Sequence, residues 1–478
     1  TLSATATYNA GMPKITVPSR TGYTFKGYYS KVNGLGTQYY SSTGASARNC
    51  DFYAATTLYA YWTANGYTIK YDKNKPAAAS ETITGSTSDS SHTYDAAKSL
   101  NANGYVLKGW TFRGWATTTN GAVVYENKES VVNLSAVNGA TVTLYAVWKA
   151  NVYFVEYDKN KPATASGTVT GSTTRSSHSY DSYGALSENG FALKGWTFQG
   201  WAHDSGAKTA DYRGGEKVTN LAYETDSSVK LYAIWKANSY KLKYAANQPA
   251  GASGAVGGNI AETTHVYDQT SVLPANEFSL VGWTFRGWAL IPNSAETDFA
   301  DGAAAYNVAD AEGAVVTLYA VWKANEYTIT YEANAPATAS GTITGSTNVS
   351  SHTYDAEKSL NENGYGLRGW TFLGWAKTAN GAALYEDTQN VVNLSTVNGA
   401  TVTLYAVWKA NTYSISFDTV GGSFTEAISA VYDSDIPSLI APTRKGYNFN
   451  GYYAERDGNG TKFFESDGNA LLKYTVLG

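Results

Sequence analysis

The sequence predicts a tandem array of small, mostly β domains, because two motifs recur along it at one period. Gly-Trp-Thr-Phe-x-Gly-Trp occurs four times, at residues 109–115, 195–201, 282–288 and 369–375. Leu-Tyr-Ala-x-Trp occurs five times, at residues 58–62, 144–148, 231–235, 318–322 and 404–408. Both recur in steps of 86 or 87 residues, and together they contain all 13 tryptophans. A fixed period indicates the architecture more strongly than any single residue.

The period divides the 478 residues into about six units of roughly 87 residues. Solenoid repeats typically have about 20–45 residues and depend on their neighbours for a core. A unit of this size can bury about 60% of its surface by itself, which favours beads on a string. The expected units are residues 1–64, 65–150, 151–237, 238–324, 325–410 and 411–478.

Composition excludes several functional classes. Hydrophobic residues make up 43% of the chain and aromatic residues 14%, which indicates folded domains. With 15% charged residues and a net charge of −4, the chain lacks the basic footprint of a nucleic-acid-binding protein. The single cysteine, Cys50, cannot form an intrachain disulfide. No apolar run approaches the length of about 18 residues that a membrane helix needs, and no signal peptide or initiator methionine precedes Thr1.

The unit at 65–150 illustrates the elements in order. Residues 67–72 alternate apolar and polar side chains, which predicts a half-buried first strand. Pro76 ends this strand because proline has no amide donor for a ladder. A Ser/Thr/Ala/Gly-rich loop or weakly paired ribbon follows to residue 90, and residues 92–95 form a short second strand.

The second half of the unit is also mainly strand. Residues 96–101 are the only candidate for a helical turn. Residues 110–115 form the third strand, where Gly114 predicts a bulge or a close backbone approach. Residues 142–148 form the closing strand, with large side chains on both faces. Each unit is therefore a small, mostly β domain of the α+β type.

Short junctions join the units. Only residues 149–152 separate one closing strand from the next opening strand, which restricts how neighbouring units can swing. A compact unit of this size has a radius of gyration of about 12 Å and is about 30 Å across. Five to six units in line then span roughly 150–180 Å, so we expect an elongated rod.

The two end units depart from the pattern. The first unit opens at its second strand, at residues 7–9, and lacks a first strand. The last unit has no Leu-Tyr-Ala-x-Trp motif, although residues 471–477 are a candidate for a degenerate closing strand. A missing strand exposes a sheet edge that can pair with another chain. Head-to-tail strand exchange is therefore an alternative to simple truncation.

Three motifs in a fixed order resemble the Listeria–Bacteroides repeat, also called the internalin B-repeat. They are Tyr-x-Ile-x-Phe/Tyr-Asp, Gly-Tyr-x-Phe-x-Gly-Tyr/Trp and Leu-Tyr-Ala-x-Trp. The plainest matches are residues 20–28 and 444–452 in the end units, and residues 273–288 also fit. The resemblance implies a compact β-grasp-like fold that occurs in tandem in bacterial cell-surface and secreted proteins, often adhesins. It implies no catalytic residues.

Two features depart from that family. The internal units carry Trp where the family usually has Tyr in the middle motif. They also carry a longer Pro/Ala/Ser/Gly loop, such as residues 162–167, where the family usually has a short Asn-Gly-Gly turn. Only the last unit keeps Gly421-Gly422. The resemblance therefore supports the fold more strongly than it supports any binding role.

The repeated histidines are the first candidate site, because imidazole can bind metals or sense pH. His92, His178, His265 and His352 each stand two residues before a Tyr-Asp pair, one in each internal unit. No second ligand follows at metal-binding spacing, and the end units carry Ala6 and Ala430 at this place. The sequence therefore favours structural hydrogen bonds. His203 stands alone.

The aromatic residues are the second candidate, since aromatic faces pack on sugar rings. In the unit at 65–150 these residues are Trp110, Trp115, Tyr125, Tyr145 and Trp148. The alternative is that they form the core and the contacts between units of a small β domain. Tyr replaces Trp in the end units, so the position requires an aromatic ring and not an indole. The sequence favours packing.

Acidic residues end the first strands and raise the question of calcium. Asp72, Asp158, Glu332 and Asp418 occupy this position, but Ala245 replaces them in one unit and no loop resembles an EF-hand. We interpret them as solvated turn residues. Asn133-Leu-Ser and Asn393-Leu-Ser match a glycosylation acceptor that is common by chance.

The sequence predicts a protein without catalysis, cofactor or metal, since no Ser/His/Asp set or phosphate-binding loop recurs. The leading hypothesis is a structural stalk or fibre in adhesion on the bacterial surface, whose partners are its own neighbouring repeats. The first alternative is a multivalent module that binds glycans or host and matrix proteins through repeated aromatic surfaces, where avidity compensates weak contacts. The second is a filament subunit that self-associates by strand complementation.

Overall fold

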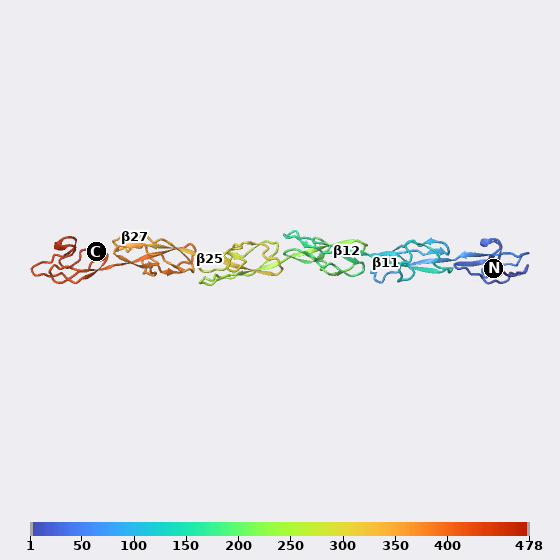
Figure 1. Cartoon of the computed structure of the whole chain (residues 1–478), viewed down its shortest axis with the longest axis horizontal. Coiled ribbons are helices and arrows are strands. Elements are labelled where there is room, and N and C mark those ends of the chain that lie inside the picture. Colours follow the sequence, from blue (N-terminus) through green and yellow to red (C-terminus); the bar gives the residue numbers. More distant parts are fainter. Residues whose placement is uncertain (1–2, 476–478) are drawn as a thin grey trace. The chain divides into compact units, whose positions relative to one another are not determined.

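The computed structural model describes residues 3–475, and the regular secondary structure of these residues is almost only β-strand, joined by loops (Figure 1). The chain divides into two compact units between Lys236 and Ala237. Within the described residues there is no α-helix, and the helical elements are two short 3-10 turns, η1 (Val32–Gly34) and η2 (Arg456–Gly458). The predicted mostly β class with repeated sheets is confirmed.

The first compact unit contains three larger sheets, named here sheets I to III. Sheet I has the order β2 (Gln38–Tyr40), β1 (Tyr23–Tyr29) and β3 (Tyr59–Ala64). Sheet II has the order β6 (Ser90–Thr93), β4 (Gly66–Asp72), β11 (Thr141–Ala150) and β9 (Trp110–Ala116). Sheet III has the order β14 (Ser176–Ser179), β12 (Val152–Asp158), β19 (Ser228–Ala237) and β17 (Trp196–Ala202).

The second compact unit contains sheets IV and V and a C-terminal segment (residues 412–475). Sheet IV has the order β21 (Thr263–Val266), β20 (Ser239–Ala245), β25 (Ala314–Ala324) and β23 (Trp283–Ala289). Sheet V has the order β28 (Ser350–Thr353), β26 (Glu326–Glu332), β33 (Thr401–Ala410) and β31 (Trp370–Ala376). The C-terminal segment has two separate pairs, β34 (Thr412–Ile415) with β35 (Ile428–Val431) and β36 (Tyr452–Tyr453) with β37 (Lys462–Phe464).

Short antiparallel ribbons accompany sheets II to V. They pair β5 (Thr84–Gly85) with β8 (Tyr105–Val106), β7 (Lys98–Ser99) with β10 (Ser130–Val131), β13 (Thr170–Gly171) with β16 (Phe191–Ala192), β15 (Gly184–Ala185) with β18 (Lys217–Val218), β22 (Ser271–Val272) with β24 (Ala304–Ala305), β27 (Ile343–Gly345) with β30 (Tyr365–Leu367), and β29 (Lys358–Ser359) with β32 (Asn390–Val391).

The closing strand is the centre of each four-stranded sheet. In sheet II, β11 pairs in parallel with β4 and antiparallel with β9. Parallel neighbours cannot be joined by a hairpin, and the second and third strands lie in the sequence between β4 and β11. Because β11 has a strand on either side, Leu144 and Ala146 are both fully buried. This position explains the apolar, strand-forming sequence of the Leu-Tyr-Ala-x-Trp motif.

The predicted bulge in the third strand is confirmed. The pairing of β9 with β11 shifts register between Phe112 and Gly114, and Gly114 has φ +145°. A Cβ at Gly114 would lie 2.7 Å from the carbonyl oxygen of Tyr125, so only glycine fits the close backbone approach there. The bulge leaves Trp115 opposite Ala146, where the small side chain makes room for the indole.

The helical turn predicted at residues 96–101 is wrong. Asp95 has φ +60°, which ends the regular backbone, and β7 then pairs with β10. Leu100 is buried, and its backbone amide donates to the carbonyl of Glu129. Residues 96–99 are all exposed and only Leu100 is buried, so the stretch lacks the apolar face that a packed helical turn would present.

The candidate closing strand at residues 471–477 lies partly outside the described residues. In the described part, Lys473 forms a β-bridge with Asp435, and the amide of Tyr474 donates to the carbonyl of Ser434. This stretch therefore pairs with the turn after β35 and not between first and third strands, the place that β33 takes in sheet V.

Candidate functional site

The four repeated histidines lie in the cores and not on a surface. His92 is buried, stacks on Tyr67 of the neighbouring strand at 5.6 Å between ring centroids, and its Nε2 lies 2.9 Å from Ser90 Oγ. His178, His265 and His352 repeat the stacking and the hydrogen bond to a hydroxyl. Burial lowers the pKa of all four below the ordinary 6.5, which keeps them neutral. The structural interpretation of these residues is supported.

The described residues hold no group of three His, Cys, Asp or Glu side chains that could bind a metal. His203 is exposed, and its Nε2 lies 3.1 Å from Tyr212 Oη. Asp72 and Asp158 each accept the amide of the residue two positions later, at 2.7 and 2.8 Å, which is a local turn. Glu332 is exposed, and Asp418 accepts the amide of Val420.

The tryptophans divide into two classes. Trp115, Trp201, Trp288 and Trp375 are fully buried, and the other nine are half-buried. Trp148 packs its ring on Phe112 and donates its Nε1–H to the carbonyl of Lys73, 2.9 Å away. Tyr125 and Tyr145 are half-buried as well. These contacts lie within one repeat and support the interpretation that the rings form its core.

A single asparagine joins consecutive sheets. Between β11 and β12 lies only Asn151, whose amide donates to the carbonyl of Gly109 at 2.8 Å and whose carbonyl accepts the amide of Tyr180 at 2.9 Å. Its side chain accepts from Thr111 Oγ1 and donates to the carbonyl of Tyr223. All four groups of the linker residue are therefore bonded, two to each side of the junction. Asn65, Asn325 and Asn411 repeat the backbone pair.

A glycine and a tyrosine meet across each of these junctions. A Cβ at Gly109 would lie 2.1 Å from Cδ1 of Tyr180, so the ring rests directly on the glycine backbone. Gly109 has φ +77°, and Tyr180 is 4% exposed. The same contact joins Gly22 to Tyr94, Gly282 to Tyr354 and Gly369 to Tyr432. The glycine that opens the middle motif therefore also forms the junction.

The aspartate after this tyrosine clamps the preceding repeat. Asp181 accepts hydrogen bonds from Trp110 Nε1 at 2.9 Å, from the Ser80 amide at 3.0 Å and from Ser80 Oγ at 2.6 Å. Asn220, in the same repeat as Asp181, fixes the position of the aspartate. Asn220 Nδ2 donates to the Asp181 carboxylate at 2.9 Å, and Asn220 Oδ1 accepts the Asp181 amide. We call this set the aspartate clamp.

The clamp recurs in the second compact unit. Asp355 accepts from Trp283 and Ser253, and Asp433 accepts from Trp370 and Ser340. Burial opposes ionisation of Asp181 and Asp355, but the hydrogen bonds from serine, tryptophan and asparagine outweigh it and lower the pKa of both to about 2. Each clamp is therefore a charged acceptor across the whole neutral pH range.

The clamp residues were missed as functional residues, although the sequence held their signal. Tyr-Asp follows each repeated histidine, and a serine recurs four residues after the proline of each long loop, for example Ser80 after Pro76. The long loop that departs from the family places this serine at the junction. Asn133 and Asn393, the glycosylation candidates, bind Asp95 and Asp355 through both the Oδ1 and the Nδ2 atoms. Their side-chain amides are therefore engaged.

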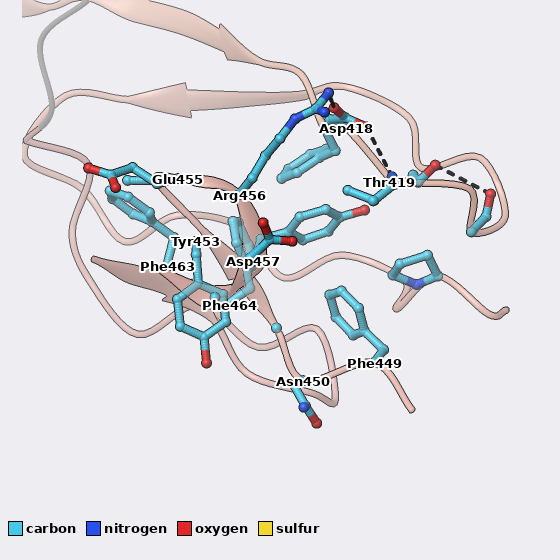
Figure 2. A pocket seen from close by; sticks show the side chains of 18 of the residues that line it. Asp418, Thr419, Phe449, Asn450, Tyr453, Glu455, Arg456, Asp457, Phe463 and Phe464 are labelled. Carbon is cyan, nitrogen blue, oxygen red and sulfur yellow. Dashed lines mark hydrogen bonds and ion pairs between the residues drawn. The ribbon is translucent and has the colours of Figure 1, made fainter. Parts of the chain in front are cut away.

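The C-terminal segment contains a cleft of about 640 Å³ (Figure 2). One wall is residues 414–418, and the other is residues 447–453. The rings of Phe417 and Tyr452 both line the cleft, with centroids 4.5 Å apart and planes tilted by 40°. Figure 2 shows Arg456 reaching Asp418, 2.7 Å away, on one side and Phe449 and Asn450 on the other.

The match to a known family falls on the two ends of the chain. The model of the Listeria-Bacteroides repeat domain matches residues 1–55 and 413–471. These two end segments each match the Listeria-Bacteroides repeat. The matched ends are the segments with Tyr in the middle motif. The internal repeats differ from them by the Trp in that motif and by the long loop that carries the clamp serine.

The relatives of this chain are longer proteins. A protein of Evansella cellulosilytica whose name describes it as a Gly-rich membrane protein is 26% identical over 91% of this chain and 44% of its own length. Internalin H of Listeria monocytogenes is 32% identical over 20% of this chain and 16% of its own. A solved structure, the Bacillus anthracis TIE protein, covers 55% of this chain and 52% of that one at 11% identity with a TM-score of 0.19, which carries no argument.

The chain therefore spans less than half the length of the first of these relatives. Within residues 3–475, no helix is long and apolar enough to cross a membrane. Side-chain hydrogen bonds of the linker asparagine and of the aspartate clamp cross the junction between neighbouring repeats.

Proposed function

We propose that this chain is a non-enzymatic part of a bacterial surface or extracellular protein, in which about six β-grasp-like repeats form a stiff stalk or fibre for adhesion. The observation that carries the proposal is the junction. One linker residue with all four polar groups bonded, a ring seated on a glycine and an aspartate clamp join neighbouring repeats. A flexible string of domains needs none of these contacts.

The energetic argument favours stiffness. A hydrogen bond to a charged group contributes about 1.5–3 kcal/mol and a neutral one about 0.5–1.5 kcal/mol. A junction with a linker asparagine and a charged clamp therefore resists bending by several kcal/mol, well above thermal energy. The location at the surface is supported by the repeat family and by relatives named as a membrane protein and an internalin. The histidines and aspartates that could serve catalysis are engaged in structural hydrogen bonds.

Small-angle X-ray scattering of the chain tests the proposal. We expect a maximum dimension on the order of 150–180 Å and the scattering of a thin rod. The matched control is a variant with Gly-Gly-Ser inserted after Ala150, which separates the Asn151 contacts without changing any sheet. It should scatter as a hinged chain with a broader distance distribution. A compact globule, or a wild-type profile as flexible as that of the insertion variant, would refute the stalk.

A further inference from the structure

The chain enters and leaves each repeat with a four-stranded sheet through two strands that are direct neighbours. In sheet II it enters at β4, immediately after the linker Asn65, and leaves at the end of β11, immediately before the linker Asn151. The two strands pair in parallel over five consecutive residues of each, residues 68–72 with residues 141–145. Sheets III, IV and V have the same parallel pair of first and closing strands.

Tension along the chain therefore acts on this pair in shear. Because the strands are parallel, a pull on the start of β4 and on the end of β11 drives the two strands past each other along their own axes. The hydrogen bonds of a parallel pair are evenly spaced between the strands, so this sliding strains all of them together. A pull across the sheet separates strands from one end and breaks the bonds one at a time. The linker of one residue passes the pull from β11 directly to β12 of the next repeat.

The sheared pair is anchored on both sides and in the core. β6 flanks β4 and β9 flanks β11, so neither strand of the pair lies at an edge of the sheet. Ile69 of β4 and Leu144 and Ala146 of β11 are fully buried. Sliding by one residue would turn these side chains from the core to the opposite face, because side chains alternate along a strand. Sliding therefore disrupts hydrogen bonds and core packing in the same step.

Two side chains lengthen the connection beyond the paired residues. Asn74, which follows β4, has φ +43° and donates its Nδ2–H to the carbonyl of Ala146, 2.8 Å away. Trp148 of β11 donates its Nε1–H to the carbonyl of Lys73 at 2.9 Å. We call these two bonds the side-chain ties. Both join the segment after the first strand to the closing strand, so the same sliding strains them. The ties recur in the other three sheets, from Asn160 and Trp235, Asn247 and Trp322, and Asn334 and Trp408.

We propose that each repeat built on sheets II to V is a tension-bearing unit. The parallel pair of first and closing strands and the side-chain ties keep the repeat folded while the protein that contains it is pulled along the chain. This inference goes beyond the stalk, because it concerns resistance to stretching within a repeat and not stiffness at the junctions. It holds equally for a flexible string of repeats.

Single-molecule force spectroscopy of the whole chain, held by tags added at its two ends, tests the proposal. Each of these repeats should unfold in one step that lengthens the chain by roughly 250–280 Å, because about 86 residues extend to about 3.3–3.6 Å each and a folded repeat is about 30 Å across. The matched control pulls the same sheet in another direction. Handles at Lys70→Cys in β4 and Thr117→Cys after β9, both exposed positions, pull across sheet II in a chain that also carries Cys50→Ala.

The unfolding force should be several-fold higher along the chain than across the sheet at the same loading rate. Equal forces in the two directions would overturn the proposal, and this comparison needs no substitution in the core. The Gly-Gly-Ser insertion after Ala150 should leave the force along the chain unchanged, since it lies outside the paired residues. A chain that is flexible in scattering but resistant in pulling would therefore refute the stalk and leave this inference standing.

The side-chain ties have a test of their own. Phenylalanine keeps a ring but removes the indole donor, so it replaces the tryptophan of each tie at positions 148, 235, 322 and 408. Loss of one hydrogen bond in the sheared region should raise the unfolding rate of each repeat at a fixed force roughly 2- to 13-fold.

The control for the ties replaces four asparagines whose side-chain bonds lie outside the first and closing strands. These are Asn103, Asn189, Asn276 and Asn363, each changed to alanine. They should lower stability in denaturant but leave the unfolding rate at a fixed force within about twofold, because their bonds are still intact when the strands begin to slide. An equal rise of the rate in both sets of variants would mean that the ties act through overall stability alone, and their part in the proposal would be overturned.

Discussion

Replacement of Gly109 by alanine isolates the contact between neighbouring repeats. The new Cβ would lie 2.1–2.3 Å from three carbons of the Tyr180 ring, where real Cβ contacts are beyond 3.0 Å. The ring must therefore retreat from the junction, or the linker must move. Gly139→Ala is the matched control, because Gly139 lies in the same repeat at φ +76°, against +77° for Gly109, and has no atom within 4 Å of a built Cβ.

The magnitude is the difference between the two substitutions. An alanine in the left-handed region costs roughly 1–2 kcal/mol at either position. Only Gly109→Ala adds the overpacking of a ring that is 4% exposed, which typically costs about 1–3 kcal/mol. Because every 1.4 kcal/mol is tenfold in an equilibrium constant, the junction should open about 5- to 150-fold more often.

Hydrogen exchange resolved by residue measures this opening directly. The amides of Asn151 and Tyr180 cross the junction, so they report its local opening and not global unfolding. We expect their protection to fall by that factor in Gly109→Ala and to stay within about twofold of wild type in Gly139→Ala. Equal loss in both variants would mean that backbone strain alone acts, and the reasoning about the ring contact would be refuted.

Three further predictions concern the clamp, the histidines and the core. Asp181→Asn should destabilise its junction by about 1–2 kcal/mol in the same exchange assay, since a neutral amide is the weaker acceptor. Because the folded pKa of Asp181 is about 2, the wild-type clamp should be fully effective above the ordinary 3.8 and weaken as pH falls from there towards 2, which a pH series of Asn151 exchange checks. Burial lowers the pKa of the four buried histidines below 6.5, so the unfolded chain takes up protons first; melting temperature should decline as pH falls below 6.5, and replacing all four with glutamine should flatten that decline. In denaturant unfolding, Trp375→Ala should cost about 3–5 kcal/mol, whereas Trp408→Ala, half-buried, should cost about 1–3 kcal/mol.

The strands could be predicted because the contacts within one sheet determine the pattern of side chains along each strand. The first strand alternates apolar and polar residues, and the closing strand is mainly apolar because it has a neighbour on either side. Gly114 indicated its bulge because a non-glycine residue would meet a backbone carbonyl. These elements depend on contacts within one sheet, and the period of the side chains reports such contacts.

The junction could not be predicted to the same depth. Ser80 and Asp181 are 101 residues apart, and each belongs to a polar loop that has no period of its own. Their pairing depends on how two complete repeats dock, which no window of sequence encodes. The recurrence of Tyr-Asp and of the loop serine was visible, but recurrence alone does not distinguish a solvated turn from a clamp. The helical turn at 96–101 failed for a related reason, because Asp95 has a left-handed backbone and its amide bonds to Asn133, a residue distant in the sequence.

One motif therefore has three structural roles in each repeat. In Gly109–Trp115 the first residue supports the ring of the next repeat, the second donates its indole to the clamp, and the last fills the core. Core and junction are thus encoded together, so a copy of a repeat carries half of each junction with it. Copies can then be added or lost without new contacts having to arise, provided that the linker asparagine and the Tyr-Asp step remain. A substitution at Trp115 should destabilise the core of one repeat, whereas a substitution at Gly109 or Trp110 should weaken the junction with the neighbouring repeat. Hydrogen exchange at Asn151 and Tyr180 distinguishes these two effects.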